Sequence, residues 1–318
     1  MSATQEPLRT DWTRLAERGT GGALRAGVWL YRLLGSRLCR LLLLPTAAYF
    51  YLKERAWRGA SRRHLEAVWS QPEGRARLGR RPGALAPLRH YYEFGVQVFD
   101  RMLLWGGGLD RFEMEHAGSE HLFALARERR GALLLGSHLG SFDMARTLAT
   151  RYGLVLNAVM YTDNGERINR LFEDLDPGSR VRVLMFDPTS VKTAFEIKAC
   201  LDRGEMVGIL ADRLPEGSRE EPYRIDFLGQ PVAFPRSPFL LACLLGCPVL
   251  VSLCVRVGVA RYRTTVEPIG GGPRLPRRER EKAAEELARA YASHLESVCL
   301  RYPYQWFNFY DVPGAHAA

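Results

Sequence analysis

The segment from Gly131 to Asp143, GALLLGSHLGSFD, constrains the fold more than any other part of this 318-residue chain. Its apolar run Ala132–Leu135 has the length of a buried strand, and Ser141 is a favourable N-cap for a helix that follows. The segment therefore predicts a strand, a loop and a helix, with His138 in the loop. In open α/β sheets, reactive side chains lie at this carboxyl edge of the strands.

Asp143 lies five positions after His138, in the first turn of the expected helix. A carboxylate there can reach back to the imidazole, fix its tautomer and stabilise the imidazolium that forms when the ring accepts a proton. The pair is therefore a candidate catalytic dyad. The alternative is a surface or capping pair, which an isolated His–Asp spacing usually represents. Gly136 and Gly140 favour the functional interpretation, because they let a substrate approach the backbone closely.

Predicted strands and helices alternate beyond this segment, which favours an α/β fold with a mixed, mostly parallel central sheet flanked by helices. A hairpin expected after Val255 makes the sheet mixed. The expected strands are Ala132–Leu135, Leu154–Met160, Val181–Phe186, Met206–Leu210, Val249–Val255 and Tyr262–Val266. The expected helices are Ala86–Leu104, Ser119–Arg130, Glu166–Leu175, Ser190–Arg203, Pro238–Leu245 and Arg277–Arg301.

The net positive charge of the chain comes from its first quarter. Residues 1–81 hold 16 Lys and Arg against 6 Asp and Glu, whereas the remainder is balanced. Between Leu24 and Leu42 the leucines share a broad helical face opposite Arg25, Arg32 and Arg40, as in a basic amphipathic helix that lies in a membrane interface. The uncharged run Leu41–Leu52 is too short to span a bilayer, and we expect Pro45 to interrupt it.

These patterns divide the chain into four parts. We expect a loose N-terminus (1–23), a helical membrane-associated segment with a connector (24–105), a catalytic domain (106–310) and a tail (311–318). The alternative for residues 24–52 is a helix packed on the protein's own core. Residues 1–23 lack the apolar core of a secretory signal, so we expect the protein at the cytoplasmic face of the inner membrane.

The sequence of the loop resembles a known family. His138–Asp143, HLGSFD, resembles the HX4D/E motif of the lysophospholipid acyltransferase superfamily. Downstream segments are similar, in the same order, to motifs of its lipid A late-acyltransferase branch, the lauroyl and myristoyl acyltransferases. These segments are Gly208–Arg213, Ile225–Pro238, Leu240–Leu250 and Tyr302–Phe309, and the likeness extends from about Arg25 to about Tyr310.

This resemblance implies a glycerol-phosphate acyltransferase-like fold and a membrane-associated acyltransferase. It would move a fatty acyl chain from acyl-CoA or acyl-acyl carrier protein to a hydroxyl or amine of a lipid acceptor. The resemblance implies direct attack and no cofactor besides the acyl donor, and the chain has no G-x-S-x-G nucleophile elbow. Trp306-Phe-Asn-Phe-Tyr-Asp replaces the basic ending of lipid A enzymes, so we expect a different acceptor.

Within this interpretation His138 is the base and Asp143 orients it. Backbone N–H groups near Gly140, or Arg213, are candidate donors to the oxyanion that develops on the thioester. The candidate substrate-binding residues are Gly140, Ser141, Asn169, Arg170, Asp212, Arg213 and Phe234. For Asp212–Arg213 the alternative is a structural salt bridge, and for the apolar loop that holds Phe234 it is simple core packing.

Two alternative functions use the same residues: an inactive lipid- or carrier-binding homologue, and a hydrolase that replaces the acceptor with water. The spacing of the six cysteines and seven histidines predicts no metal site, so the thiols are expected to be buried and free. The other histidines are expected to be structural or on the surface. We do not expect nucleic acid as a partner of the basic N-terminus, because zinc spacings and RNA-binding strings are missing from the sequence.

Overall fold

The computed structural model describes residues 20–105, 108–145, 152–160, 181–185, 192–214, 218 and 220–309. Its helices in these ranges are α2 (Thr20–Lys53), α3 (Arg55–Ser70), α4 (Pro72–Leu78), α5 (Ala86–Trp105), α6 (Ser119–Arg127), α9 (Lys192–Asp202), α10 (Ser237–Leu245) and α11 (Arg277–Arg301). Its strands are β1 (Glu113–Ala117), β2 (Ala132–Gly136), β3 (Leu156–Met160), β4 (Val181–Met185), β5 (Met206–Leu210), β6 (Tyr223–Phe227), β7 (Gln230–Phe234), β8 (Pro248–Gly258) and β9 (Arg261–Gly271).

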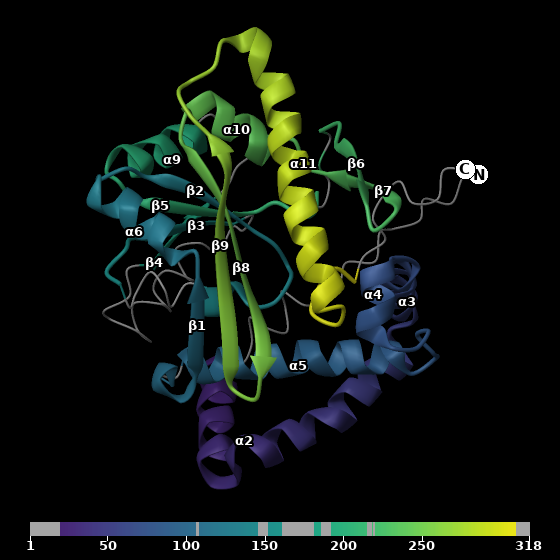
Figure 1. Cartoon of the computed structure of the whole chain (residues 1–318). Coiled ribbons are helices and arrows are strands. Elements are labelled where there is room, and N and C mark those ends of the chain that lie inside the picture. Colours follow the sequence, from purple (N-terminus) through teal and green to yellow (C-terminus); the bar gives the residue numbers. More distant parts are fainter. Residues whose placement is uncertain are drawn as a thin grey trace, which may run out of the picture.

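A seven-stranded sheet in the order β1-β9-β8-β2-β5-β3-β4 forms the centre of the molecule (Figure 1). The five strands from β8 to β4 run parallel to one another, whereas β9 is antiparallel to β8 and β1 is parallel to β9. The expected α/β fold with a mostly parallel sheet flanked by helices is confirmed, and so is the hairpin after Val255. Register pairs Gly136 of β2 with Leu210 of β5, so the residues that follow both strands meet at one carboxyl edge.

Both faces of the central strands are buried. Leu133 and Leu135 contribute to a large core that also includes residues of α9, α10 and α11. Leu134 and Met206 belong to a second cluster, which includes Leu122 of α6. This double burial explains why the strands read as continuous apolar runs rather than as alternating patterns.

The predicted elements in the described residues match the observed ones to within a few residues at most ends, and β5 and α11 match throughout. Helix α6 ends at Arg127 rather than Arg130, because Arg129 adopts a positive φ of 53° that turns the chain into β2. The expected helix Glu166–Leu175 and the two terminal segments, 1–19 and 310–318, lie outside the described residues.

The segment predicted as an apolar loop is partly a hairpin, β6–β7, which forms a separate two-stranded sheet. Its turn residues Leu228 and Gly229 have φ values of 54° and 72°. Positive φ at both central residues is the requirement of a type I′ turn, which usually selects Asn-Gly or Asp-Gly. Leucine is unusual at the first of these positions, so the sequence pattern did not predict the turn.

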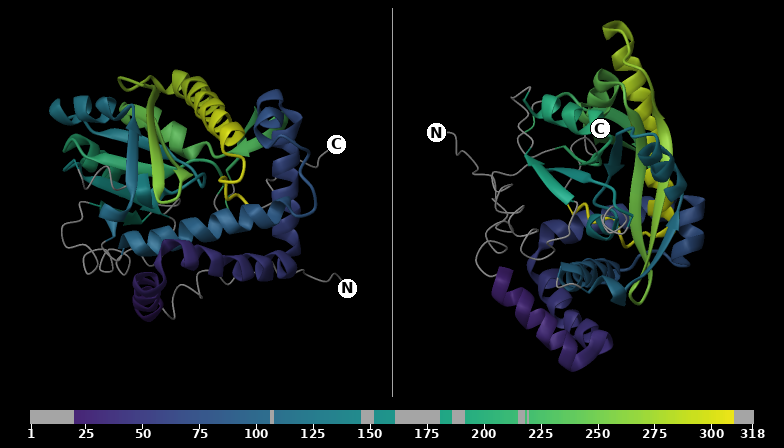
Figure 2. Two further views of the ribbon diagram at one scale, coloured as in Figure 1. Left: turned by 60° about the horizontal axis from the view of Figure 1, so that its bottom comes forward. Right: turned by 90° about the vertical axis from the view of Figure 1, so that its left-hand side faces the viewer.

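Helix α2 has two arms, which meet at a bend (Figure 1). The bend is at Gly35, with φ 71° and ψ 171°, and the expectation that Pro45 interrupts the helix was wrong. The second arm lies along α5, as the left view of Figure 2 shows. Within the described residues, no helix has the length and the apolar composition that a membrane crossing requires.

The polar side of α2 differs from the expectation at Arg40. Its guanidinium is buried and binds both carboxylate oxygens of Asp100 on α5 at 3.0 Å. Leu38, Leu41 and Leu42 are instead exposed. The side chains of Leu24–Leu34 lie outside the described residues, so the amphipathic pattern is described only from Leu38 onward.

Candidate active site

The loop after β2 uses its own backbone amides to hold its shape. The N–H of Leu139 donates to the Ser137 hydroxyl at 2.9 Å, and the N–H of Gly140 donates to the Gln305 carbonyl at 2.8 Å. The N–H of Ser141 donates to the Cys254 carbonyl at 2.7 Å, and its hydroxyl accepts the N–H of Met144 at 3.3 Å, as an N-cap should. The amides of residues 139–141 are thus engaged within the protein, so in this conformation they are not free to act as oxyanion donors, and Arg213 stays a candidate.

Gly140 is required by the close packing of this loop. Its φ is +70°, and a Cβ atom there would lie 1.9 Å from the carbonyl oxygen of Cys254 on β8. The need for glycine therefore comes from the neighbouring strand rather than from space for a substrate.

His138 is held by Asp212, which follows the neighbouring strand β5. Its ring nitrogen Nδ1 lies 2.8 Å from Oδ1 of Asp212, and its backbone N–H donates to Oδ2 at 2.9 Å. The indole N–H of Trp306 donates to the same Oδ2, also at 2.9 Å. The His138 side chain keeps 23% of its surface exposed, while that of Asp212 is fully buried. Since Nδ1 is occupied, Nε2 is the ring nitrogen left to exchange a proton with a substrate.

The buried carboxyl of Asp212 stays ionised. Burial raises its pKa, but the charge of His138 and the hydrogen bonds from His138 and Trp306 outweigh that effect, so the pKa lies below its ordinary value. The carboxylate accepts hydrogen bonds and orients the ring, which is the arrangement that stabilises an imidazolium during general-base catalysis.

Asp143 makes a different contact from the one expected. Its Oδ2 lies 2.7 Å from Nε of Arg101 on α5, whose side chain is 40% exposed. The carboxylate that holds Nδ1 of His138 in this structure is therefore Asp212, and the role predicted for Asp143 stays a prediction. The Asp143–Arg101 pair links α5 to the helical turn that follows the loop.

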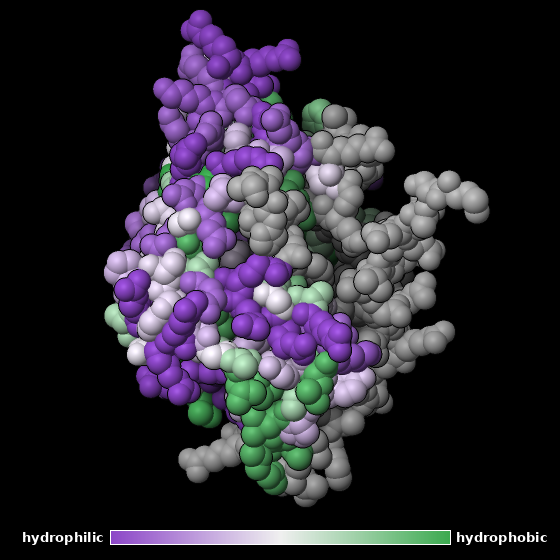
Figure 3. Space-filling model, turned by 90° about the vertical axis from the view of Figure 1, so that its right-hand side faces the viewer, coloured by the Kyte–Doolittle hydropathy of each residue, from purple (hydrophilic) through white to green (hydrophobic). Residues whose placement is uncertain are grey.

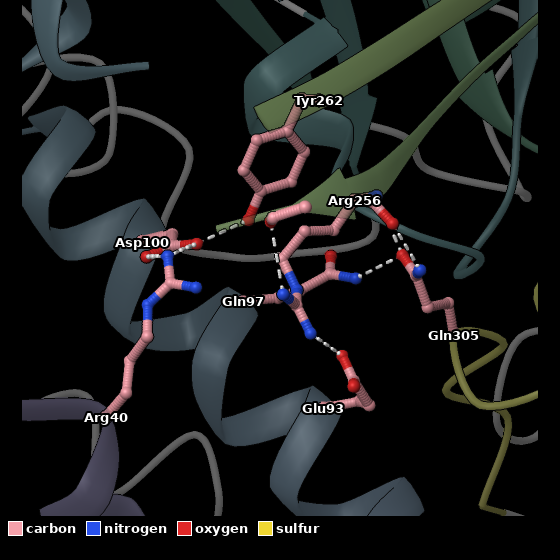
Figure 4. A network of polar contacts seen from close by, with 8 residues as sticks. Arg40, Glu93, Gln97, Asp100, Arg256, Tyr262 and Gln305 are labelled. Atoms are coloured by element: carbon pink, nitrogen blue, oxygen red, sulfur yellow. Dashed lines mark hydrogen bonds and ion pairs between the residues drawn. The ribbon is translucent and has the colours of Figure 1, made fainter. Parts of the chain in front are cut away.

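A polar network supports the loop from the C-terminal side (Figure 4). The Gln305 side chain accepts the backbone N–H of Arg256 at 2.8 Å and donates to the Arg256 carbonyl at 2.7 Å. Gln97 of α5 donates to the same Gln305 oxygen at 3.0 Å. The Arg256 guanidinium pairs with Glu93. The network thus ties α5 and β8 to the segment that carries Trp306.

An apolar pocket lies beside the loop, on the face of the sheet that α6 covers. Phe142, inside the HX4D-like motif, lies at its wall. Gly136 and Gly208 leave room for the Phe142 ring, since a Cβ atom at either position would lie 3.3 or 3.2 Å from it. The other large side chains of the wall are Leu122, Leu134, Leu154, Leu156 and Met206. The pocket is a small, mostly apolar cavity, and His138 is not among the residues that line it.

Comparison with protein families supplies an independent observation. The model of the bacterial lipid A biosynthesis acyltransferases matches residues 110–311, more than half of the chain. The chain belongs to the lipid A biosynthesis acyltransferase family. Membership in this family indicates an acyltransferase that acts on lipid substrates. A comparison with curated proteins gave no match.

Other residues predicted for this acyltransferase site have separate outcomes. Arg213 follows Asp212 and is partly exposed, and its role stays a prediction. Phe234 is fully buried and packs edge-on against Phe227 at 5.7 Å between ring centres, so it is a core residue. Asn169 and Arg170 lie outside the described residues.

Sequence reasoning missed Trp306 and Arg101 as neighbours of the site. Trp306 lies in the C-terminal segment that resembles the family motif, and this resemblance was the one sequence feature that pointed to it. Arg101 lies in a helix about 40 positions before the motif, and the spacing gave no hint of it. The described residues hold no group of acidic, histidine and cysteine side chains suited to a metal ion, and the six cysteines are buried free thiols.

Proposed function

We propose that this protein transfers a fatty acyl chain from an acyl thioester, acyl-CoA or acyl-acyl carrier protein, to a hydroxyl or amine of a lipid acceptor. His138 acts as the general base through Nε2 and removes the acceptor proton as the acceptor attacks the thioester carbonyl. The carbon–sulfur bond then breaks and the thiol leaves with a proton. The observation that best supports His138 as the base is the hydrogen bond from its Nδ1 to the buried, ionised Asp212, at 2.8 Å.

The small apolar pocket beside Phe142 is compatible in chemistry with a fatty acyl chain, and it would have to widen to hold one. Its wall is made of leucine, methionine and phenylalanine side chains, which favour an aliphatic chain over a polar one.

The reaction is tested by measuring thiol release from long-chain acyl-CoA and acyl-acyl carrier protein, with solubilised enzyme and with or without a bacterial lipid extract. We expect lipid-dependent release, and mass analysis of the new lipid identifies the acceptor. His138→Ala should lower the rate by about 10²- to 10⁴-fold, the usual contribution of a general base. Release without lipid would identify a hydrolase. The absence of release would leave an inactive binding protein.

Two further variants separate the carboxylates. Asp212→Asn removes the charge that orients His138 and should lower kcat nearly as much as His138→Ala does. Asp143→Asn removes the negative charge that pairs with Arg101, and we expect a smaller effect. The reverse order of effects would restore the original His138–Asp143 dyad and overturn the assignment of Asp212.

We further propose that the second arm of α2 docks on an anionic membrane surface. Hydrophobic residues gather at the lower end of the molecule, beneath a belt of hydrophilic ones (Figure 3). The exposed apolar side chains there are Leu38, Leu41, Leu42, Leu44, Tyr49 and Leu52. Leu85 extends this patch, because the Tyr51 hydroxyl of α2 binds the carbonyl of Ala84 at 2.9 Å.

The neighbouring charges favour an anionic surface. Lys53, Arg55, Arg62 and Arg63 are exposed where α2 ends and α3 begins. Each basic side chain near an anionic bilayer contributes about 1 kcal/mol. Because Arg40 is paired inside with Asp100, the apolar side chains of α2 face outward, as an interfacial helix requires.

Vesicle flotation tests this docking. Vesicles with about 30% phosphatidylglycerol should carry the protein, and pure phosphatidylcholine vesicles should carry less, because basic side chains are attracted to anionic lipid. Leu41→Glu with Leu52→Glu should abolish flotation. Phe195→Glu is the matched control, since Phe195 is 70% exposed on α9. Equal flotation of the double variant and the control would refute the docking surface.

A further inference from the structure

The segment after α11 returns across the active site and pairs with the loop of His138. The N–H of Phe307 donates to the His138 carbonyl at 2.9 Å, and the Gly140 N–H donates to the Gln305 carbonyl at 2.8 Å. Between these bonds, Leu139 and Trp306 form an antiparallel bridge. The loop therefore has a second strand-like partner from the far end of the chain.

Trp306 extends this pairing to Asp212. Its indole N–H donates to Oδ2 at 2.9 Å, and its ring packs against Phe227 at 5.2 Å and His64 at 5.2 Å between ring centres. The Trp306 side chain is buried, so water does not readily replace this hydrogen bond. A hydrogen bond to a charged acceptor is stronger than one between neutral groups.

The backbone of Trp306 is also fixed. His90 of α5 donates through Nε2 to the Trp306 carbonyl at 3.0 Å, and Gln305 is held by Arg256 and Gln97. A carboxylate rotates easily about its terminal torsion, so the fixed indole donor, together with the backbone N–H of His138 on the same Oδ2, limits that rotation. Functional groups that must be placed within a fraction of an ångström need this kind of outer support.

We propose that Trp306 is a positioning residue: its indole N–H fixes Asp212, and Asp212 in turn fixes the imidazole of His138. This assignment rests on the proposed acyl transfer with His138 as base. It gives the C-terminal segment a role in the reaction that depends on one hydrogen bond rather than on packing alone.

The variant Trp306→Phe removes the N–H and keeps an aromatic ring in the same space. We expect kcat to fall about 10- to 100-fold, with KM changed less than about twofold, because the bond acts on the base and not on substrate binding. The control is Trp57→Phe. The Trp57 ring stacks on Phe309 of the same segment at 5.7 Å, and its replacement should leave kcat unchanged.

A double-mutant cycle separates positioning from general support. If Trp306 acts through Asp212, adding Trp306→Phe to Asp212→Asn should change kcat less than about twofold. The same loss in both backgrounds, or an unchanged kcat in Trp306→Phe, would overturn the proposal. Circular dichroism and thermal melting verify that each variant is folded.

A readout independent of activity keeps this test separate from that of the proposed function. In protein labelled with ¹⁵N-histidine, the Nδ1–H signal of His138 is assigned by its loss in His138→Ala. We expect this signal to shift or broaden in Trp306→Phe and to stay in place in Trp57→Phe. A signal unchanged in Trp306→Phe would overturn the positioning role even in an enzyme that lacked transferase activity.

Discussion

His64 provides a direct test of how α3 holds the active-site segment. Its Nε2 donates to the Pro303 carbonyl at 2.9 Å, while its buried Nδ1 has no hydrogen-bond partner among the described residues. Protonation would place a charge and an unsatisfied N–H in the interior, 5.7 Å from the ring of His90. Burial therefore lowers the pKa of His64 to about 4, and the hydrogen bond to Pro303 offsets this only in part.

The direction and size of the pH effect follow from this pKa. In the unfolded chain a histidine has a pKa of about 6.5, so between pH 6.5 and 4 the unfolded state binds a proton that the folded state does not. The free energy of unfolding is therefore highest above pH 6.5 and falls as the pH drops to about 4. A difference of about 2.5 pH units corresponds to about 3 kcal/mol, at 1.36 kcal/mol for each unit. His90 adds to the same trend, because burial, followed by the charge of His64, also lowers its pKa.

The assay is urea unfolding followed by tryptophan fluorescence at several pH values from 7.5 to 4. His64→Gln keeps an amide donor for Pro303 but cannot titrate, so its free energy of unfolding should fall about 3 kcal/mol less than that of the wild type over this range. His121→Gln is the control, because His121 is exposed on α6. Parallel pH curves for wild type and His64→Gln would refute the reasoning.

Three other perturbations test the remaining parts of the structure. Arg40→Ala removes the ion-pair partner of the buried Asp100, which keeps a hydrogen bond from the Tyr262 hydroxyl at 2.7 Å. This variant should lose about 3–5 kcal/mol in urea unfolding, and a loss below about 1 kcal/mol would mean that the pair is solvated. Gly140→Ala forces a Cβ atom against Cys254 and should abolish activity and destabilise the fold by at least about 1–3 kcal/mol, measured by thermal melting; a stable, active variant would contradict the loop geometry. The six cysteines should resist iodoacetamide at pH 8 until the protein is unfolded, because all six are buried and burial raises the pKa of Cys247 to about 11 and that of Cys254 to about 12. Rapid labelling of the native protein, measured by mass spectrometry, would contradict this burial.

The two carboxylates near His138 show where sequence reasoning succeeds and where it stops. The spacing of His138 and Asp143 identified the loop and its candidate base, because in a strand–loop–helix segment two residues five positions apart can lie close together. The same spacing cannot tell which carboxylate faces the ring. Asp212 is 74 positions away and reaches Nδ1 only because β2 and β5 are neighbours in register.

The N-terminal helix gives a similar contrast. Its composition correctly indicated a long helix with an apolar face, since helical periodicity is local. The direction of that face depended on Arg40, which the pattern assigned to the outer side. The carboxylate of Asp100, brought near by α5, provides a buried partner, so Arg40 lies inside and the leucines lie outside.

By itself, the sequence determined the alternation of strands and helices, the loop that holds the candidate base His138, and the family. These features depend on local periodicity, turn chemistry and short motifs. The tertiary structure decided which groups meet there. It brought Asp212 from β5, Arg101 from α5 and Trp306 from the end of the chain to one loop. Such contacts depend on sheet order and on long-range packing, which are global properties that no local spacing encodes.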